Sequence, residues 1–501
     1  MKATLLAVGA LAVVFSASAK VELGAPFSDG AVLQRGMKVP VWGSAEAEKT
    51  ITVSFAGAEV SATAGADGKW MVKLPEMDAS SEGRTMTVSG DGSVEVKDIL
   101  VGEVWFASGQ SNMECPIWGN ACRYRDFAGG LMTTMTRLPN VRYVKVDRNW
   151  SVETRPQTAK WCKFTPEYLQ LFHRVNTQLA GSNTGVSLSA VAFYYARELY
   201  LALGIPVGIV DASWGGTNID AWTPRCGYED CDPSIRATAD YPVKSDWNAE
   251  TDKAGPVHGA HQQPTVLFNG MVGAFAPMAM RGFIWYQGCH NSGESELYCA
   301  KMHALYNGWS KAFMNPELKL YFVQLAPWQQ NWMGLVTAQN KFVAEEPHAA
   351  IAVTADVGNF ADIHPNRKEI VAKRLVVHAL KRDYGFEIAE EDSPVFKSAS
   401  FADGKATLKF DHVKSWYAYD AEFWREPPFE LAGKDGVWTA AKLVNEANRQ
   451  PWQCGEIKGV DLVLEAEGVA EPVKVRYMGK DKTMGNLYNE ASLPLGPFET
   501  K

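Results

Sequence analysis

A serine near residue 111 stands between a predicted strand and a predicted helix. Residues 99–107 form a short, continuous apolar and β-branched run, which is typical of a buried strand. The run ends at Ser108-Gly109, a turn signal, and Ser111 follows where a helix could begin. A serine in that position is ordinarily a helix N-cap. On a sharp turn, however, its hydroxyl is held clear of the backbone, beside N–H groups that suit an oxyanion.

Three more chemically unusual clusters follow predicted strands farther along the chain. They are Trp214-Gly215-Gly216-Thr217, Gly288-Cys289-His290-Asn291 and Asp362-Ile363-His364-Pro365. Because the carboxyl ends of parallel strands meet at one edge of a sheet, all four clusters should lie together. A nucleophile, a glycine N–H, an amide side chain and an acid–base pair are the parts that acyl transfer needs. The sequence therefore predicts an acyl-transfer site at this edge.

His364 is the predicted base of this site. We expect a helix to start at Pro365, and its positive end would keep the neighbouring imidazole neutral near pH 7. A nearby carboxylate would orient the ring and select its tautomer. Asp362 is the nearest candidate in sequence, and Asp356 is the second.

The remaining clusters offer hydrogen-bond donors for a developing oxyanion. A glycine of the 215–216 pair would present its N–H to substrate with no side chain in the way, although two glycines can simply form a tight turn. The Asn291 amide would be a second donor. We expect substrate contacts from the side chains beside these donors, namely Gln110, Trp214, Gln287 and His290.

Aromatic residues crowd the same loops. They are Trp118, Trp214, Trp222, Trp285, Tyr286, Trp328 and Trp332. Most should be core residues, because aromatic side chains bury large areas. One or two of them would be free to stack on the apolar face of a sugar ring.

The elements that position these clusters divide the chain into three parts after a leader. Residues 20–97 read as a small β-sandwich, because short strands alternate with Gly, Asp and Ser turns. Residues 98–390 alternate apolar strands with helices, which predicts a three-layer α/β/α domain with a parallel sheet. Residues 391–501 are again β-rich. The predicted fold class is thus α/β with a β-rich domain on each side.

Individual elements follow from local patterns. The strands predicted for the central sheet are 99–107, 207–212, 282–287, 318–324 and 350–355. The helices predicted around it are 189–203, 297–314, 334–344 and 365–382. In the last helix, Val371, Leu375 and Ala379 mark one apolar face at i, i+4 spacing.

Composition and the first residues suggest where the protein works. The formal net charge of −8 argues against nucleic acid or an anionic membrane as partner. Residues 1–19 have a charged start, a short apolar core and an Ala17-Ser18-Ala19 cleavage site, which predicts a signal peptide. The first cysteine is Cys115, so no lipid-anchor cysteine lies near the cleavage point. We expect a secreted or periplasmic protein.

Eight cysteines in an exported chain predict disulfides. The natural local pairs are Cys115–Cys122, Cys226–Cys231 and Cys289–Cys299, which leaves Cys162 with Cys454. Zinc is less expected, because no two CxxC pairs occur together.

Four sequence blocks together resemble the SGNH hydrolases, and more narrowly the sialate O-acetylesterase family of carbohydrate esterases. The blocks are GQSNM at 109–113, WGGTNIDAW at 214–222, WYQGCHN at 285–291 and IHP at 363–365. Segments 27–35 and 485–489 resemble the two ends of that family, so the resemblance covers nearly the whole mature chain.

The resemblance implies roles for particular residues. Ser111 would be the nucleophile and His364 the base, and the oxyanion hole would combine the Ser111 N–H, Gly216 and the Asn291 amide. No metal or organic cofactor is implied. The wider class places its aspartate three residues before the histidine, where this chain has Ala361. The third member would then be Asp362, with Asp356 as the second candidate, or the site is a serine–histidine dyad helped by a backbone carbonyl.

The expected activity is removal of acetyl groups from an acetylated glycan or sialic acid through an acetyl-enzyme. In the third block Cys289 and His290 stand where the family usually has Glu and Ser, which affects substrate contacts rather than the oxyanion amide. Two alternatives are a carbohydrate-binding protein without catalysis and an esterase for longer acyl chains.

Overall fold

The computed structural model describes most of the chain after its leader. The described ranges are 21–90, 92–117, 137–165, 188–253, 257–418, 427–445 and 455–500. The predicted signal peptide, residues 1–19, lies outside them. Within these ranges, no helix is both long enough and apolar enough to cross a membrane.

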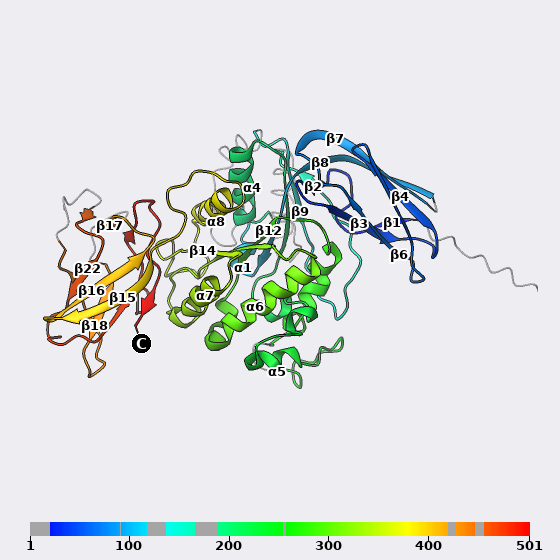
Figure 1. Cartoon of the computed structure of the whole chain (residues 1–501). Coiled ribbons are helices and arrows are strands. Elements are labelled where there is room, and N and C mark those ends of the chain that lie inside the picture. The colour runs from blue at the N-terminus through cyan, green and yellow to red at the C-terminus, as the bar shows by residue number, and fades with distance from the viewer. Residues whose placement is uncertain are drawn as a thin grey trace, which may run out of the picture.

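A sheet that is parallel over most of its width forms the middle layer of the molecule (Figure 1). Its main path runs in the order β10-β9-β11-β8-β12-β13-β14, and only β10 is antiparallel to its neighbour. The strands are β8 (Gly92–Gly109), β9 (Val141–Lys145), β10 (Cys162–Lys163), β11 (Val207–Ser213), β12 (Gly282–Tyr286), β13 (Lys319–Val323) and β14 (Ala349–Ala352). The five predicted strands are confirmed, with small shifts at their ends.

Helices cover both faces of this sheet. Successive strand residues point to opposite faces, so both faces carry apolar side chains that helices can bury. Trp105 of β8 packs edge-on against Tyr195, whereas the next residue, Phe106, packs edge-on against Trp309. Tyr195 belongs to α4 (Ala190–Leu203) and Trp309 to α6 (Ser295–Ala312). As Figure 1 shows, α4 and α8 (Lys368–Arg382) lie on one side of the sheet, and α6 and α7 (Met333–Glu345) on the other. The predicted three-layer arrangement is confirmed.

The N-terminal part is built from antiparallel strands. One sheet has the order β1-β3-β6, from strands Glu22–Leu23, Val39–Ser44 and Lys69–Leu74. In the other, β4 (Thr50–Phe55) pairs with β5 (Ala58–Thr63) and β7 (Ser80–Gly90), and β7 pairs with the first half of β8. The second half of β8 belongs to the central sheet, where β2 (Val32–Gln34) runs parallel beside it. The long strand β8 therefore joins the N-terminal strands to the central sheet, and its end leads to Ser111.

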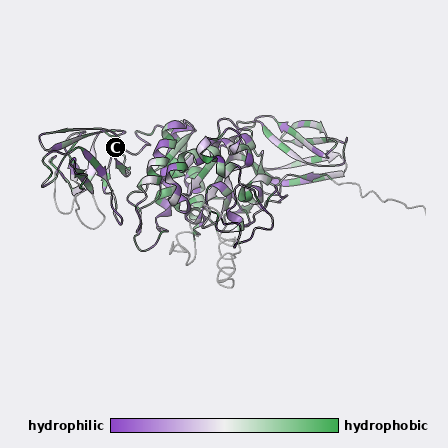
Figure 2. Ribbon diagram, turned by 90° about the horizontal axis from the view of Figure 1, so that it is seen from below, coloured by the Kyte–Doolittle hydropathy of each residue, from purple (hydrophilic) through white to green (hydrophobic). Residues whose placement is uncertain are grey.

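The C-terminal part is all β. Its three sheets have the orders β15-β16-β22-β20, β21-β17-β24 and β19-β18-β23-β25. The strands are β15 (Val395–Ala402), β16 (Lys405–Asp411), β17 (Trp416–Ala418), β18 (Phe429–Ala432), β19 (Thr439–Ala440), β20 (Lys442–Leu443), β21 (Gly455–Ile457), β22 (Leu462–Glu465), β23 (Lys474–Tyr477), β24 (Leu487–Tyr488) and β25 (Phe498–Glu499). They enclose a core of their own around Trp416 and Tyr477. Figure 2 shows the two β-rich parts at opposite ends of the helical middle.

The last predicted helix begins later than expected. It starts at Lys368 rather than Pro365, so Pro365 is not in its first turn. The preceding loop closes on its own side chains: Asn359 Oδ1 accepts from the N–H of Ala361, and Asp362 Oδ1 accepts from that of His364. Such Asx turns compete with helical hydrogen bonds. The predicted apolar face of Val371, Leu375 and Ala379 is buried, as expected.

Most of the predicted disulfides are wrong. Cys162, Cys226, Cys231, Cys289 and Cys299 are free thiols, so the pairs 226–231, 289–299 and 162–454 do not form. Their sulfurs lie in different surroundings: the Cys299 Sγ lies 3.5 Å from Glu345, and the Cys226 Sγ lies 3.5 Å from the Gly308 carbonyl. The Cys115–Cys122 pair stays a prediction, because Cys122 lies outside the described residues.

Candidate active site

Ser111 lies at the turn where β8 ends and α1 (Ser111–Glu114) begins. The turn brings the backbone very close to the neighbouring strand, since the N–H of Gln110 donates to the Tyr286 carbonyl at 3.0 Å. Gly109 has φ +136°, and a Cβ built on it would lie 2.3 Å from the same carbonyl oxygen. Glycine is therefore the only residue type that fits at 109, and the turn holds the hydroxyl of Ser111 at the sheet edge.

We expect Gly109→Ala to disrupt this turn. The added Cβ meets the rigid backbone of β12, so the free energy of unfolding should fall by about 3 kcal/mol. A matched control is Gly57→Ala, because Gly57 also has positive φ but has no atom within 4 Å of the added Cβ. Denaturant unfolding of both variants measures the difference. Equal stability losses would show that the close approach at 109 is unimportant.

Three side chains form a hydrogen-bonded row at this edge. The Ser111 Oγ lies 2.8 Å from Nε2 of His364, although the two residues are 253 positions apart in sequence. The Nδ1 of the same ring lies 3.1 Å from Asp362 Oδ1, which also accepts from the backbone N–H of His364. The side chains of His364 and Asp362 are 26% and 19% exposed, so they are shielded but reachable. This is the order of groups that activates a serine hydroxyl.

Asp356, the second candidate carboxylate, is engaged elsewhere. Both of its oxygens accept from Arg374 at 2.7 Å, and Tyr488 donates to one of them at 3.3 Å. The carboxylate that contacts His364 is that of Asp362.

Burial keeps the His364 ring neutral. It lowers the pKa of His364 below 6.5, the Lys368 ammonium lowers it further, and Asp362 acts in the opposite direction. The sequence predicts a low pKa from a helix N-terminus directly after the ring. Because α8 begins four residues later, the pKa is lowered mainly by burial, and Lys368 is the charged group that lowers it further.

The glycine pair after β11 differs in the two N–H groups it offers. The Gly215 N–H donates to Glu114 Oε2 at 2.8 Å, and Arg148 holds the other oxygen of that carboxylate at 2.6 Å. Gly216 is exposed, with φ +70°, and nothing lies within 4 Å of the position of a Cβ. Of the two, Gly216 is therefore the glycine that faces open space.

Asn291 is fully buried and held at three points. Its Oδ1 accepts from the Ile219 N–H at 3.0 Å and from Gln287 Nε2 at 2.8 Å, and its Nδ2 donates to Glu294 at 3.0 Å. These contacts fix which end of the amide carries the N–H groups. A primary amide has two such groups, so one bond to Glu294 leaves donor capacity.

The four expected substrate contacts differ in position. Gln110 is buried and accepts from the backbone N–H groups of Gly288 and His290, so it braces the loop that carries Asn291. Gln287 is also buried, and it donates to Thr217 as well as to Asn291. Both side chains therefore support the site from behind.

Trp214 and His290 are the half-buried members of that set. The Trp214 ring stacks on His261, with 4.8 Å between centroids and 9° between planes, and Arg148 lies over it. The His290 ring lies edge-on to His258, at 6.0 Å. Of the four residues, these two are the ones that a ligand could reach.

Two contacts near Ser111 were not predicted from the sequence. One is the bond from Glu114 to the Gly215 N–H. The other is made by Asn112, which accepts from Lys368 Nζ and donates to the Ile363 carbonyl at 3.1 Å. Both Glu114 and Asn112 belong to the helix turn that Ser111 starts, and that adjacency was the available signal.

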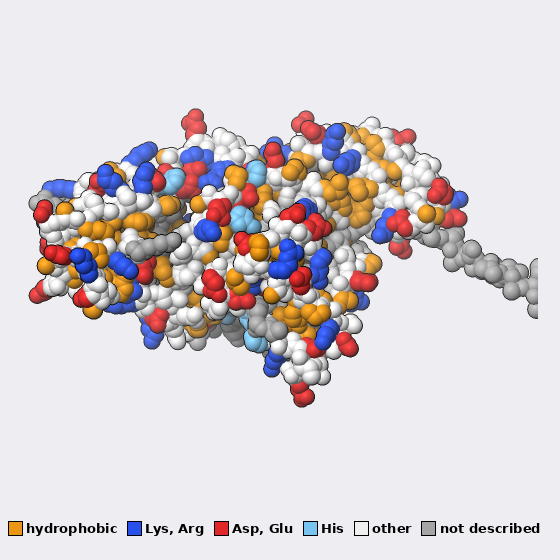
Figure 3. Space-filling view, turned by 60° about the horizontal axis from the view of Figure 1, so that its bottom comes forward, with side chains coloured by type: hydrophobic (Ala, Val, Ile, Leu, Met, Phe, Trp, Pro, Cys, Tyr) orange, Lys and Arg blue, Asp and Glu red, His pale blue; other side chains and the backbone are white. Residues whose placement is uncertain are grey.

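Side chains with metal-ligand spacing occur away from this row. In the described part of the chain they form two groups, Cys299 with His303 and Glu345, and Glu390 with Asp392 and His412. Neither group includes Ser111, His364 or Asp362. Acidic and basic side chains are interspersed on the face drawn in Figure 3.

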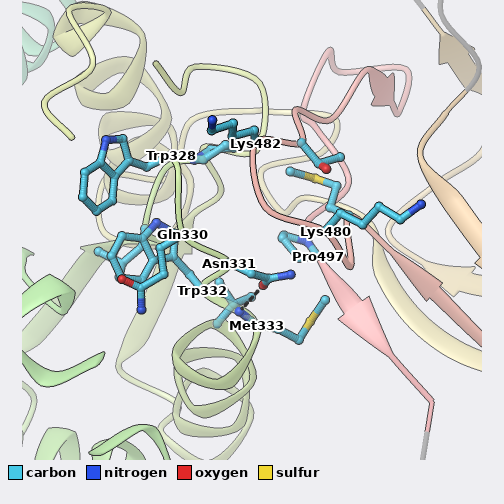
Figure 4. A pocket seen from close by; sticks show the side chains of 13 residues that line it. Trp328, Gln330, Asn331, Trp332, Met333, Lys480, Lys482 and Pro497 are labelled. Carbon is cyan, nitrogen blue, oxygen red and sulfur yellow. Dashed lines mark hydrogen bonds between the residues drawn. The ribbon is translucent and has the colours of Figure 1, made fainter. Parts of the chain in front are cut away.

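A pocket with tryptophan in its wall lies between the loop after β13 and the C-terminal part (Figure 4). Trp328 and Trp332 stack there, with 6.0 Å between ring centroids, and Lys480 and Lys482 also line the pocket. The Pro327 carbonyl accepts from the Asn359 N–H, and Gln329 donates to the Phe360 carbonyl at 2.9 Å. The pocket wall is thus bonded to the loop that leads to His364.

The other aromatic residues of the predicted set lie elsewhere. Trp222, Trp285 and Tyr286 are core residues, and Trp118 lies outside the described residues.

Comparisons with known proteins agree with this geometry. Residues 101–372, more than half of the chain, match the family model described as carbohydrate esterase, sialic acid-specific acetylesterase. The sialate O-acetylesterase of Homo sapiens is 25% identical over 413 residues, covering 75% of this chain and 73% of that protein; the Rattus norvegicus enzyme is 24% identical over 392 residues, covering 69% and 70%. The crystal structure of a carbohydrate acetylesterase from Xanthomonas citri covers 96% of this chain and 99% of its own, with 31% identity and a TM-score of 0.77.

The parallel sheet and the row of hydroxyl, imidazole and carboxylate at its edge, together with these matches, define the class of protein: it is a carboxylic ester hydrolase. Within that class, the chain belongs to the sialic acid-specific acetylesterase family of carbohydrate esterases.

Proposed function

We propose that the protein removes acetyl groups from sugar hydroxyls through an acetyl-enzyme on Ser111. The observation that carries the proposal is the contact of Ser111 with His364 at 2.8 Å, with Asp362 on the far side of the ring. The family match and the Xanthomonas carbohydrate acetylesterase support the acetylated sugar as substrate. The leader at 1–19 supports an exported enzyme, and fractionation of expressing cells tests this.

In the first half of the reaction, Oγ of Ser111 attacks the acetyl carbonyl carbon while Nε2 of His364 takes the hydroxyl proton. The carbonyl oxygen becomes an oxyanion, which the backbone N–H groups of Ser111 and Gly216 and the Asn291 amide would stabilise. As first residue of α1, Ser111 has an N–H without an intrahelical acceptor. The bond from carbon to the sugar oxygen then breaks, and His364 returns its proton to that oxygen.

In the second half, water attacks the acetyl-enzyme. His364 takes one proton of the water, the oxygen bonds to the acetyl carbon, and a second oxyanion forms at the same donors. Collapse breaks the bond to Ser111, whose Oγ regains the proton from His364, and acetate leaves. Throughout, Asp362 holds the Nδ1–H tautomer and stabilises the imidazolium that forms twice.

Acetate release from a panel of acetylated glycans tests this proposal. We expect release from sugar O-acetyl esters, and acetate to be preferred over butyrate or octanoate in matched chromogenic esters. A preference for the longer chains would identify an esterase for longer acyl groups instead. Glycan binding without any acetate release would identify a binding protein, and the esterase mechanism would be abandoned.

The pH dependence of the reaction should follow His364. The ring must be neutral to accept the serine proton, so kcat/KM falls as pH drops through its pKa. Because burial and Lys368 lower that pKa below 6.5, the acid limb should lie on the acid side of 6.5. A pH profile of kcat/KM with a small acetate ester measures the midpoint. A midpoint well above 6.5 would contradict the assignment of His364 as a buried base.

Trp328 should affect large substrates only. If its ring stacks on a sugar unit beyond the acetylated one, Trp328→Ala should raise KM for an acetylated polysaccharide about tenfold and leave the small ester unchanged. Trp438→Ala is a matched control, because that tryptophan is also half-buried but lies against Arg476 in the C-terminal part. Unchanged KM for the polysaccharide would place the glycan elsewhere.

A further inference from the structure

Lys368 is a buried lysine directly behind the catalytic pair. It is the first residue of α8, and it has no exposed surface. Its Nζ donates to Asn112 Oδ1 and lies 5.1 Å from the centre of the Tyr286 ring. Asn112 follows Ser111 in sequence, and its Nδ2 donates to the carbonyl of Ile363, the residue before His364.

We propose that Lys368 is a positioning residue for this esterase: through Asn112 it fixes the His364 loop against the nucleophile turn, and its charge tunes the imidazole. The inference rests on the proposed function of Ser111 and His364. The inference adds Lys368, whose described hydrogen bond goes to Asn112 rather than to Ser111 or His364.

The bond from Lys368 sets the direction of the Asn112 amide. A lysine side chain only donates hydrogen bonds when charged, so it selects the Oδ1 end of the amide and turns the Nδ2 end toward Ile363. The bridge thereby holds the chain at two points, one residue before His364 and four residues after it. Catalysis is sensitive to small displacements between reacting groups, so this bracing would protect the 2.8 Å contact with Ser111.

The position of Lys368 disfavours its charged form in free energy. Burial removes the ammonium from water, and a cation at a helix N-terminus is unfavourable as well. Both effects act on Lys368, because it is fully buried and begins the 15-residue α8. Its hydrogen-bond acceptor is an amide. Of the two groups that raise its pKa, Cys289 and Asp362, the second is a carboxylate that already serves His364. A group kept at such cost beside an active site is a candidate for a functional role.

The charge of Lys368 acts on the titratable groups around it. The titratable groups that face Lys368 are Asp362 and His364 from the loop, Cys289 from η8 (Cys289–Glu294) and Tyr286 from β12. Burial lowers the pKa of Lys368 to about 7, while Cys289 and, to a smaller extent, Asp362 act in the opposite direction. In its charged form Lys368 lowers the pKa of His364. Removal of the ammonium should therefore make the imidazole easier to protonate.

The test uses the full chain with Lys368→Met, Asn112→Ala and the double variant, assayed with a small acetate ester across pH. We expect kcat to fall 10- to 100-fold in each single variant while KM changes less than threefold. The double variant should be no worse than the poorer single variant, because both remove the same bridge. In Lys368→Met the acid limb should move to higher pH, and in Asn112→Ala, which keeps the cation, it should stay.

Controls separate this role from general destabilisation. Lys373→Met removes an exposed lysine of the same helix and should leave kcat and the acid limb unchanged. If Lys368→Met does not fold, Lys368→Arg retains the cation, and the acid limb should then stay at its wild-type position while kcat falls. A folded Lys368→Met enzyme with wild-type kcat and pH profile would overturn the inference. That result is distinct from failure of the proposed function, in which Ser111→Ala would retain activity.

Discussion

Ser111→Ala should abolish hydrolysis of a chromogenic acetate ester while the protein keeps its fold. Loss of a serine nucleophile removes the covalent route, and the remaining oxyanion donors sustain only slow attack by water, so kcat should fall about 10⁴- to 10⁶-fold. The fold should tolerate the change, because the Oγ of Ser111 has His364 as its partner and the loss of one hydrogen bond costs about 1 kcal/mol. Acetate release and thermal unfolding measure the two effects separately.

A matched control is Ser234→Ala, which alters an exposed serine of η4 (Pro233–Ile235) that is not among the site residues named above. We expect wild-type kcat from it. Near-normal activity in a folded Ser111→Ala protein would mean that another group attacks the ester.

The second large effect should come from Asp362→Asn. An asparagine can present an N–H to Nδ1 of His364 and so favour the wrong tautomer, and kcat should fall by about 10³- to 10⁴-fold with little change in KM. Replacement of the carboxylate also removes a group that raises the pKa of the ring. The kcat of the variant with a small acetate ester measures the loss.

Asp356→Asn is the informative comparison for that variant. Asp356 is paired with Arg374 at two points, so its loss should lower the unfolding free energy by about 3 kcal/mol, with kcat of the folded enzyme within tenfold of wild type. If Asp356→Asn instead loses activity as fully as Asp362→Asn, the two carboxylates act together. If Asp362→Asn is nearly as active as wild type, the site works as a dyad.

The row of Ser111, His364 and Asp362 could be predicted because it lies beyond the ends of recognisable strands. Each polar cluster follows an apolar run, and parallel strands bring such ends to one edge. This rule predicts that Ser111 follows β8 and that Asn291 follows β12, and the structure has both residues at those strand ends. His364 needed the loop beyond β14 to fold back, and residues within that loop encode the turn through Asn359 and Asp362.

Other features depend on contacts that no local pattern records. The start of α8 was misplaced because Pro365 suits a helix, whereas the Asx turns before it favour a loop. The strand β9, which lies between β10 and β11, was missed because Arg142 and Lys145 interrupt its short apolar run. The Asn112–Lys368 bond joins positions 256 apart, and only the folded chain brings them together.

The cysteine pairs show the same limit. Even numbers and short spacings suggested local disulfides, but spacing in sequence does not set the direction of a side chain. Cys289 begins η8 after β12, whereas Cys299 lies in α6 with its Sγ 3.5 Å from Glu345. Pairing rules that ignore secondary structure therefore failed here.

The most direct test of the central claim is a covalent adduct. A phosphonate ester with a good leaving group should phosphonylate the activated serine of the wild-type protein once, with loss of that leaving group, and peptide mass spectrometry should place the adduct on Ser111. Labelling should be lost in Ser111→Ala and strongly slowed in Asp362→Asn. An active enzyme whose adduct maps to any other residue, or that forms none, would contradict the account of Ser111 as the nucleophile.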